Sequence, residues 1–211
     1  MPKKIVIIGS GFSSLSAACY LAQAGNEVHL YEKNQTLGGR ARQLKEEGFT
    51  FDMGPSWYWM PDIFEKFFGD FDKKVSDFYQ LEKLDPAYYV WFKDEVVTIG
   101  DTLDKIATEF ERIEPGSSPQ LKKFIKNAGV NYDIAINDVV NKPGLSPFEL
   151  VTPETAVRVN QFFKTISDDV RKAFKNEKLV SILEFPVLFL GAKPNNTPAF
   201  YRFINYADFG L

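Results

Sequence analysis

The sequence lacks the residues that several large classes of protein require. Its 211 residues include one cysteine, Cys19, which excludes an internal disulfide framework and a cysteine-ligated zinc site. They also include one histidine, His29, which excludes a histidine-rich metal centre. No apolar run approaches the roughly 20 residues of a membrane-spanning helix. The run at residues 5–8 is too short for the core of a signal peptide. We therefore expect no metal and no spanning segment.

The sequence also lacks a large excess of basic or acidic side chains. The chain has 25 basic and 28 acidic side chains and a net charge of −3, whereas a dedicated nucleic-acid binder normally carries a basic surplus. Aromatic residues, by contrast, are abundant: they form 15% of the chain and include 20 Phe. With 45% apolar residues, the chain can bury a sizeable core. Its length allows one large domain or two small ones.

The first 31 residues have the pattern of a β-α-β unit. Residues 4–8 are rich in Val and Ile, which suits a strand buried on both faces. Residues 12–24 carry apolar side chains at helical spacing, Cys19 among them, and Gly25 with Asn26 closes the helix. Residues 28–31 form a second short strand. The pattern predicts two parallel strands joined by a helix.

The loop between the first strand and the helix has the glycines of a dinucleotide-binding turn. Its sequence is Gly9-Ser10-Gly11-Phe12-Ser13-Ser14. Gly9 permits the tight turn, and Gly11 lets the backbone approach a pyrophosphate. The N–H groups and the positive end of the helix dipole then face the anion. Ser14 replaces the third glycine of the usual pattern.

Downstream residues strengthen this prediction. Glu32, followed by Lys33, ends the second strand at about the interval where an acid accepts the ribose hydroxyls of the cofactor. Gly38 and Gly39 allow a close approach to the cofactor, and Arg40 can offer two parallel hydrogen bonds to a phosphate. The alternative is an ordinary β-α-β unit with incidental glycines. This alternative is disfavoured because the strand, turn, helix, second strand, acid and Gly-Gly-Arg all occur in the expected order. A second diphosphate anchor is typical of the FAD-binding segment of flavin oxidoreductases, which include amine oxidases and carotenoid desaturases.

The segment at residues 47–57 resembles the bacterial-type phytoene desaturases of the carotenoid desaturase family. The opening stretch at residues 9–18 and the distal stretch at residues 185–201 are similar to the same family. The resemblance implies an FAD cofactor, with Gly54, Pro55 and Ser56 beside the flavin ring. It also implies an oxidoreductase acting on CH–CH bonds that introduces double bonds into phytoene or a related carotenoid precursor.

The aromatic stretch after this segment has two interpretations. An apolar polyene needs a tunnel that excludes water, but aromatic residues at helical spacing also form ordinary cores. Both remain open for Trp57, Tyr58, Trp59, Met60, Phe64, Phe67 and Phe68. Asp52 fits a turn-forming acid better than a base. We assign no catalytic residue.

The whole chain is predicted to be α/β, with a Rossmann-like FAD-binding segment at residues 1–60. Residues 61–211 form an aromatic-rich, mostly helical α+β part of a substrate domain. Within it we expect a hairpin at residues 88–99, helices over residues 101–110 and 121–139, and one long helix from residue 153 to residue 174. Two strands do not complete a doubly wound sheet. We therefore expect the N-terminal portion of a longer enzyme, inactive by itself.

Two other functions remain possible from the sequence. One is an amine-oxidase-like flavoenzyme, and the other is a non-catalytic fragment. For the desaturase, whose substrate dissolves in bilayers, we expect a cytoplasmic protein with peripheral contact to the inner face of the cell membrane, and no nucleic-acid partner.

Overall fold

The computed structural model describes residues 1–54 and 57–211 and divides into two compact units, Met1–Tyr58 and Trp59–Leu211. We call them the head unit and the helical unit. The division lies two residues before the boundary expected from the sequence. Pro55 and Ser56, which the sequence places beside a flavin ring, lie outside the described residues.

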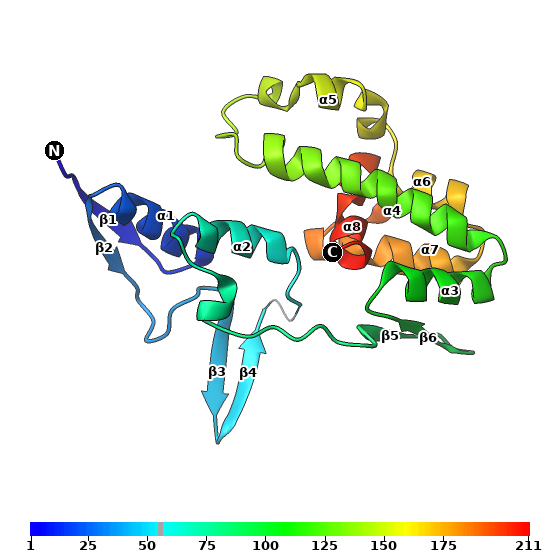
Figure 1. Cartoon of the computed structure of the whole chain (residues 1–211), viewed down its shortest axis with the longest axis horizontal. Helices are drawn as coiled ribbons and strands as arrows, with labels where there is room; N and C mark the ends of the chain where they lie inside the picture. The colour runs from blue at the N-terminus through cyan, green and yellow to red at the C-terminus, as the bar shows by residue number, and fades with distance from the viewer. Residues whose placement is uncertain (55–56) are drawn as a thin grey trace. The chain divides into compact units, whose positions relative to one another are not determined.

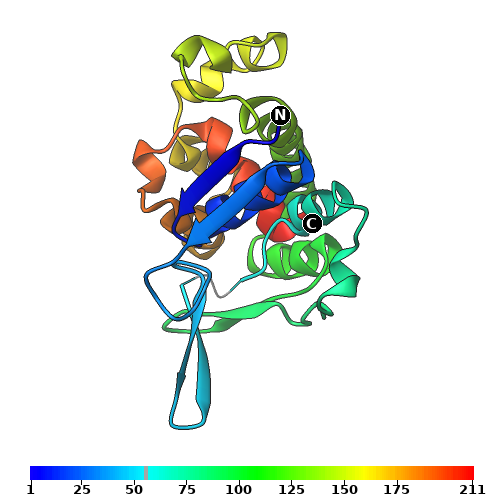
Figure 2. The same ribbon diagram turned by 90° about the vertical axis from the view of Figure 1, so that its left-hand side faces the viewer.

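The head unit begins with the predicted β-α-β arrangement. Strand β1 (Lys4–Ile8) pairs in parallel with β2 (Glu27–Tyr31), with Ile5 opposite Val28, and helix α1 (Phe12–Gln23) connects them. Figure 2 shows the two strands side by side with α1 next to them. The predicted Rossmann-like start of the chain is therefore confirmed.

An antiparallel hairpin that the sequence analysis did not predict follows in the head unit. Strands β3 (Arg42–Glu46) and β4 (Phe49–Met53) pair along their full length and extend away from α1 (Figure 1). Glu47 and Gly48 turn the chain with φ values of 48° and 84°, as a two-residue hairpin turn requires. Asp52 lies within β4 and accepts a hydrogen bond from Gln43 Nε2 at 3.0 Å, so its interpretation as a turn-forming acid is wrong.

The head unit has little core. Ser10 is the one buried side chain among its described residues, and α1 has none. Cys19, which the sequence places on a buried stripe, is exposed because no described element of the head unit covers that face of α1.

The helical unit consists of short helices and one hairpin. Its strands are β5 (Tyr88–Trp91) and β6 (Val96–Ile99), which form the predicted antiparallel pair. Its helices are α2 (Pro61–Gly69), α3 (Leu103–Ile113), α4 (Ser117–Ile134), α5 (Pro153–Ala156), α6 (Ile166–Ala173), α7 (Glu177–Glu184) and α8 (Phe203–Phe209). A π-helical turn, Ala135–Val139, extends α4.

The core of the helical unit forms around α4, which runs through the unit in Figure 1. Phe110, Leu121, Val170 and Leu183 from four helices are at most 1% exposed. Gly129 lets α4 approach α8, since a Cβ at that position would lie 2.8 Å from the ring of Tyr206. This close packing makes the helical unit a folded core in its own right.

The long helix predicted from residue 153 is wrong, because the chain breaks there into α5, a 3-10 turn (Val159–Phe162) and α6. Between the pieces, the Lys164 carbonyl accepts from Ala199 N–H at 2.8 Å, and Ile166 N–H donates to Thr197 at 2.9 Å. These long-range bonds require an extended backbone, and Thr165 then caps α6.

No helix of the described residues is long and apolar enough to cross a bilayer. A search of the same residues finds no group of three His, Cys, Asp or Glu side chains that could hold a metal ion.

Candidate dinucleotide-binding site

The turn from β1 into α1 presents backbone N–H groups at the start of a helix. Gly9 has a φ of 96° and donates its N–H to the Tyr31 carbonyl at 2.7 Å, which ties the turn to the end of β2. Gly11 is the N-cap of α1 and provides no side-chain cap. The first turn of α1 contains no acidic residue. No acidic side chain of α1 therefore opposes an anion at the positive end of the helix dipole.

Glu32 is bonded directly to this turn. Its Oε2 accepts from the Ser10 N–H at 2.9 Å and from the Ser10 hydroxyl at 2.7 Å. Its Oε1 accepts from the backbone and side-chain nitrogens of Asn34, both at 2.8 Å. The Ser10 hydroxyl bond, followed by the Asn34 N–H, lowers the pKa of Glu32 to about 2. Glu32 is therefore ionised. These four bonds use the acceptor sites of its carboxylate, so a ribose hydroxyl binds there by replacing or sharing one of them.

Asn34 was not among the predicted residues. The signal for it was local, because Asn is typical of a turn and lies shortly after the second strand. Its contribution is to hold the Glu32 carboxylate from the side opposite Ser10.

The paired glycines lie on the β1–α1 turn. Gly38 donates its N–H to the Ser10 carbonyl at 2.9 Å. A Cβ on Gly39, which has a φ of 63°, would lie 3.1 Å from Gly11 Cα. Two glycines distant in the sequence are thus in contact, and a side chain at either position would fill the space above the turn.

The Gly-Gly-Arg segment also packs against the end of β4. A Cβ on Gly54, which has a φ of 93°, would lie 2.6 Å from the Arg40 carbonyl oxygen. The Arg40 side chain is exposed, and its guanidinium makes no hydrogen bond or ion pair with any residue that the structure describes. It is therefore available to a phosphate.

The remaining predicted residues lie at the edge of this arrangement. Phe12 and Ser13 start α1 with exposed side chains, and Ser14 beside them is half-buried. Lys33 is exposed. The structure thus brings together Gly9, Ser10, Gly11, Glu32, Gly38 and Gly39, and places Arg40 and Gly54 next to them. A glycine cradle, a helix start without a cap, an ionised carboxylate and an available guanidinium fit a dinucleotide.

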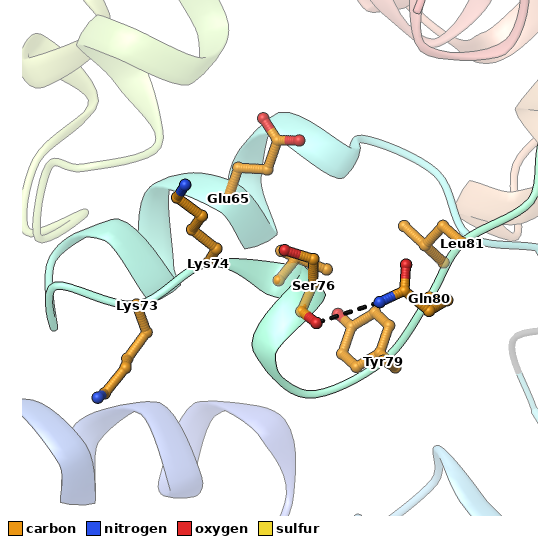
Figure 3. A pocket seen from close by; sticks show the side chains of 8 residues that line it. Glu65, Lys73, Lys74, Ser76, Tyr79, Gln80 and Leu81 are labelled. Atoms are coloured by element: carbon orange, nitrogen blue, oxygen red, sulfur yellow. Dashed lines mark hydrogen bonds between the residues drawn. The ribbon is translucent and has the colours of Figure 1, made fainter.

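A cavity of about 490 Å³ lies beside α2 in the helical unit and contains none of the predicted residues (Figure 3). Its lining mixes charged and apolar side chains, and Gln80 Nε2 donates to the Ser76 carbonyl at 3.3 Å. The ammonium groups of Lys73 and Lys74 point in opposite directions (Figure 3), so they do not converge on one anion.

The aromatic residues around α2 pack largely on one another. Phe68 stacks on Phe78 with ring centroids 4.7 Å apart, and Phe67 packs edge-to-face on Phe71 at 5.2 Å. Trp59 makes a similar contact with Phe189 at 4.7 Å. No residue of α2 is buried, however, so these contacts do not form a closed core, and both interpretations of the rings stay open.

The comparisons with known proteins agree with this geometry. Residues 7–73 match the family of NAD(P)-binding Rossmann-like domains. Over 98% of its length the chain is 41% identical to the carotenoid 3,4-desaturase of Haloarcula japonica. It is 32% identical to the zeta-carotene-forming phytoene desaturase of Myxococcus xanthus and 33% identical to a 4,4'-diapophytoene desaturase of Staphylococcus aureus, over 99% and 95% of the chain.

The chain is homologous to the carotenoid desaturases. It spans 41–43% of the length of these relatives. The predicted resemblance to the phytoene desaturases is confirmed.

Solved structures show the same fold at low sequence identity. A putrescine oxidase superposes with a TM-score of 0.58 at 16% identity, and the match covers 99% of this chain and 42% of the oxidase. A fatty acid isomerase from P. acnes gives a TM-score of 0.53 at 19% identity, covering 98% of this chain and 43% of the isomerase. The predicted fold class is confirmed. Because the amine oxidase shares only the fold, the amine-oxidase alternative has weaker support than the desaturase function.

Proposed function

We propose that this chain is part of an FAD-dependent desaturase that introduces double bonds into phytoene or a related forty-carbon or thirty-carbon carotenoid precursor. The observation that carries the proposal is the 41% identity to a carotenoid 3,4-desaturase over 98% of the chain. The relatives named for phytoene and for 4,4'-diapophytoene support the same class of apolar polyene.

In this proposal the head unit binds FAD through the residues that the structure brings together. Gly9, Ser10, Gly11 and the start of α1 with Phe12, Ser13 and Ser14 hold the pyrophosphate. Glu32, with Lys33 beside it, accepts from the adenosine ribose. Gly38 and Gly39 leave room for the cofactor, and Arg40 bonds to the diphosphate. Gly54, together with Pro55 and Ser56, lies beside the flavin ring.

Bound FAD supplies a hydride acceptor for a substrate carbon while a proton leaves the adjacent carbon. The chain's own part is to fix the dinucleotide, to keep Glu32 ionised and to hold the polyene out of water. The low pKa of Glu32, about 2, keeps its carboxylate in the accepting form across the physiological range.

We also propose a cytoplasmic protein in peripheral contact with the inner face of the cell membrane, because a long polyene dissolves in bilayers. Exposed apolar side chains of the helical unit support this contact: Leu145, Phe148, Val157 and Phe163 are each more than 80% exposed. Apolar side chains with a surrounding polar surface are what binding at a bilayer interface uses.

The test is a comparison of substrates with the FAD-loaded longer protein. Phytoene or 4,4'-diapophytoene in liposomes should be converted to products with more conjugated double bonds, whereas an aliphatic diamine should remain unchanged. Oxidation of the diamine with no change in either polyene would establish the amine-oxidase alternative instead. If flavin is bound and neither substrate reacts, the desaturase function is wrong.

A further inference from the structure

Side chains from distant parts of the helical unit hold its first residues in place. The Trp59 ring packs on Phe189 with an angle of 70° between the ring planes. The Trp59 side chain also donates a hydrogen bond to the carboxylate of Asp208 on α8. Three residues later, Asp62 accepts from the Tyr132 hydroxyl at 2.9 and 3.0 Å. The start of the helical unit is therefore attached to α4, α8 and the 3-10 turn Phe185–Leu190.

Asp208 places a carboxyl group among the buried residues of α8. It lies between two buried residues of α8, Ala207 and Phe209. Its Oδ2 accepts from the Tyr88 hydroxyl of β5 at 2.9 Å. None of the described basic side chains forms an ion pair with it. A half-buried carboxyl without a counter-ion costs free energy when it is ionised.

The surroundings of Asp208 determine its protonation. Burial raises the pKa of Asp208 to about 6, against the hydrogen bonds from Tyr88 and Trp59, which lower it. The other titratable groups nearby have partners of their own. Tyr206, on α8, packs on Tyr132, and Lys83 donates to the Leu211 carbonyl at 3.0 Å.

We propose that Asp208 is a positioning residue whose carboxylate fixes Trp59 against Phe189 and whose protonation loosens Trp59. An ionised acceptor makes a hydrogen bond roughly twice as strong as a neutral one, so the Trp59 contact depends on the charge of Asp208. The two rings adjoin an apolar surface in which Leu188 is 62% and Phe189 is 54% exposed. Resting on the proposed function, this surface is a wall for the apolar polyene, and Asp208 maintains its shape.

The experiment uses the 211-residue chain with Trp57→Phe and Trp91→Phe, which leaves Trp59 as its one tryptophan. Its fluorescence emission is recorded from about pH 4.5 to pH 8, and far-UV circular dichroism confirms the fold of each variant. The emission should change with a midpoint near pH 6, the pKa of Asp208. Asp208→Asn should abolish this change. Tyr88→Phe should move the midpoint upward, because the Tyr88 hydrogen bond lowers the pKa of Asp208.

Asp62→Asn is the matched control, since it removes a neighbouring acid of the same attachment and should leave the midpoint unchanged. Emission that does not respond to pH, or an unchanged response in Asp208→Asn, would overturn the proposal. Quenching of Trp59 emission by phytoene in liposomes then tests the substrate part, and Asp208→Asn should weaken it several-fold. A pH response without quenching would contradict the polyene wall while leaving the Asp208 anchor established. The substrate comparison with the longer protein tests the proposed function separately.

Discussion

The head unit and the helical unit keep their shapes by different means. Every buried hydrophobic side chain of the described residues lies in the helical unit, whereas the head unit buries only Ser10. The head unit instead joins its segments by backbone and polar contacts, such as Gly9 to Tyr31 and Ser10 to both Glu32 and Gly38. A ligand that binds only the folded form stabilises it by mass action, so a bound dinucleotide should matter far more to the head unit.

The two units also treat a carboxyl group in opposite ways. In the head unit, hydrogen bonds from Ser10 and Asn34 lower the pKa of Glu32 to about 2. In the helical unit, burial raises the pKa of Asp208 to about 6. The first group is ready to accept hydrogen bonds from a ligand at any physiological pH, while the second changes its charge close to neutrality.

The largest expected effect comes from one substitution made in both units. Ile106 is 2% exposed and Ile8 is 87% exposed. Ile106→Ala should lower the free energy of unfolding by about 2–5 kcal/mol, because it leaves a cavity in the core. Ile8→Ala should change it by less than about 0.5 kcal/mol. Urea unfolding followed by far-UV circular dichroism measures both, and equal effects would show that the head unit has a core after all.

A smaller effect concerns the pH dependence of the helical unit. The folded-state pKa of Asp208 is about 6 and its unfolded value is near 3.8. The folded state therefore binds the proton more tightly, and stability should fall as the pH rises from about 4 to 6. The full loss is about 3 kcal/mol, at 1.36 kcal/mol for each pKa unit.

Asp208→Asn should remove this part of the pH dependence, so that its stability relative to the parent rises between pH 4 and pH 7. Urea unfolding of both proteins at four pH values measures the difference. A difference in unfolding free energy that stays constant with pH would show that the pKa of Asp208 is not raised. The contrast between the carboxyl groups of the two units would then be smaller.

The smallest effect separates two glycines of the head unit. Gly39 and Gly25 both have positive φ values, 63° and 81°, so alanine is strained at either position. Only at Gly39 would the new Cβ meet a neighbour, Gly11 Cα at 3.1 Å. In the longer protein, Gly39→Ala should weaken FAD binding several-fold, or about 1 kcal/mol, and Gly25→Ala should leave it unchanged. Isothermal titration measures both affinities. If Gly39→Ala and Gly25→Ala bind FAD equally well, the cofactor does not lie beside Gly39.

Local sequence patterns predicted the elements whose cause is local. The β1-α1-β2 start and the β5–β6 hairpin followed from strand-forming runs and from glycines where the chain turns. The paired glycines were predicted to approach a cofactor, whereas the close approach of Gly39 to Gly11 was not predicted. The β3 strand was not predicted, because residues 42–46 are mostly polar and lack β-branched side chains.

Long-range contacts could not be predicted in this way. The break between α5 and α6 depends on bonds to residues 197 and 199, more than 30 residues along the chain. Asp208 meets Tyr88 across 120 residues, and nothing in the sequence near either residue indicates that contact. Tertiary packing, rather than local propensity, determines both features.

The FAD affinity of Glu32→Ala in the longer protein tests the central claim most directly, with Glu27→Ala as the control. Glu27 begins β2, the strand that Glu32 directly follows, and its exposed side chain is not part of the cradle. Glu32→Ala should weaken FAD binding tenfold or more, since losing a charge-assisted hydrogen bond costs about 1.5–3 kcal/mol, while Glu27→Ala should bind like the parent. An FAD affinity unchanged by Glu32→Ala would contradict the cradle and the cofactor role of the head unit.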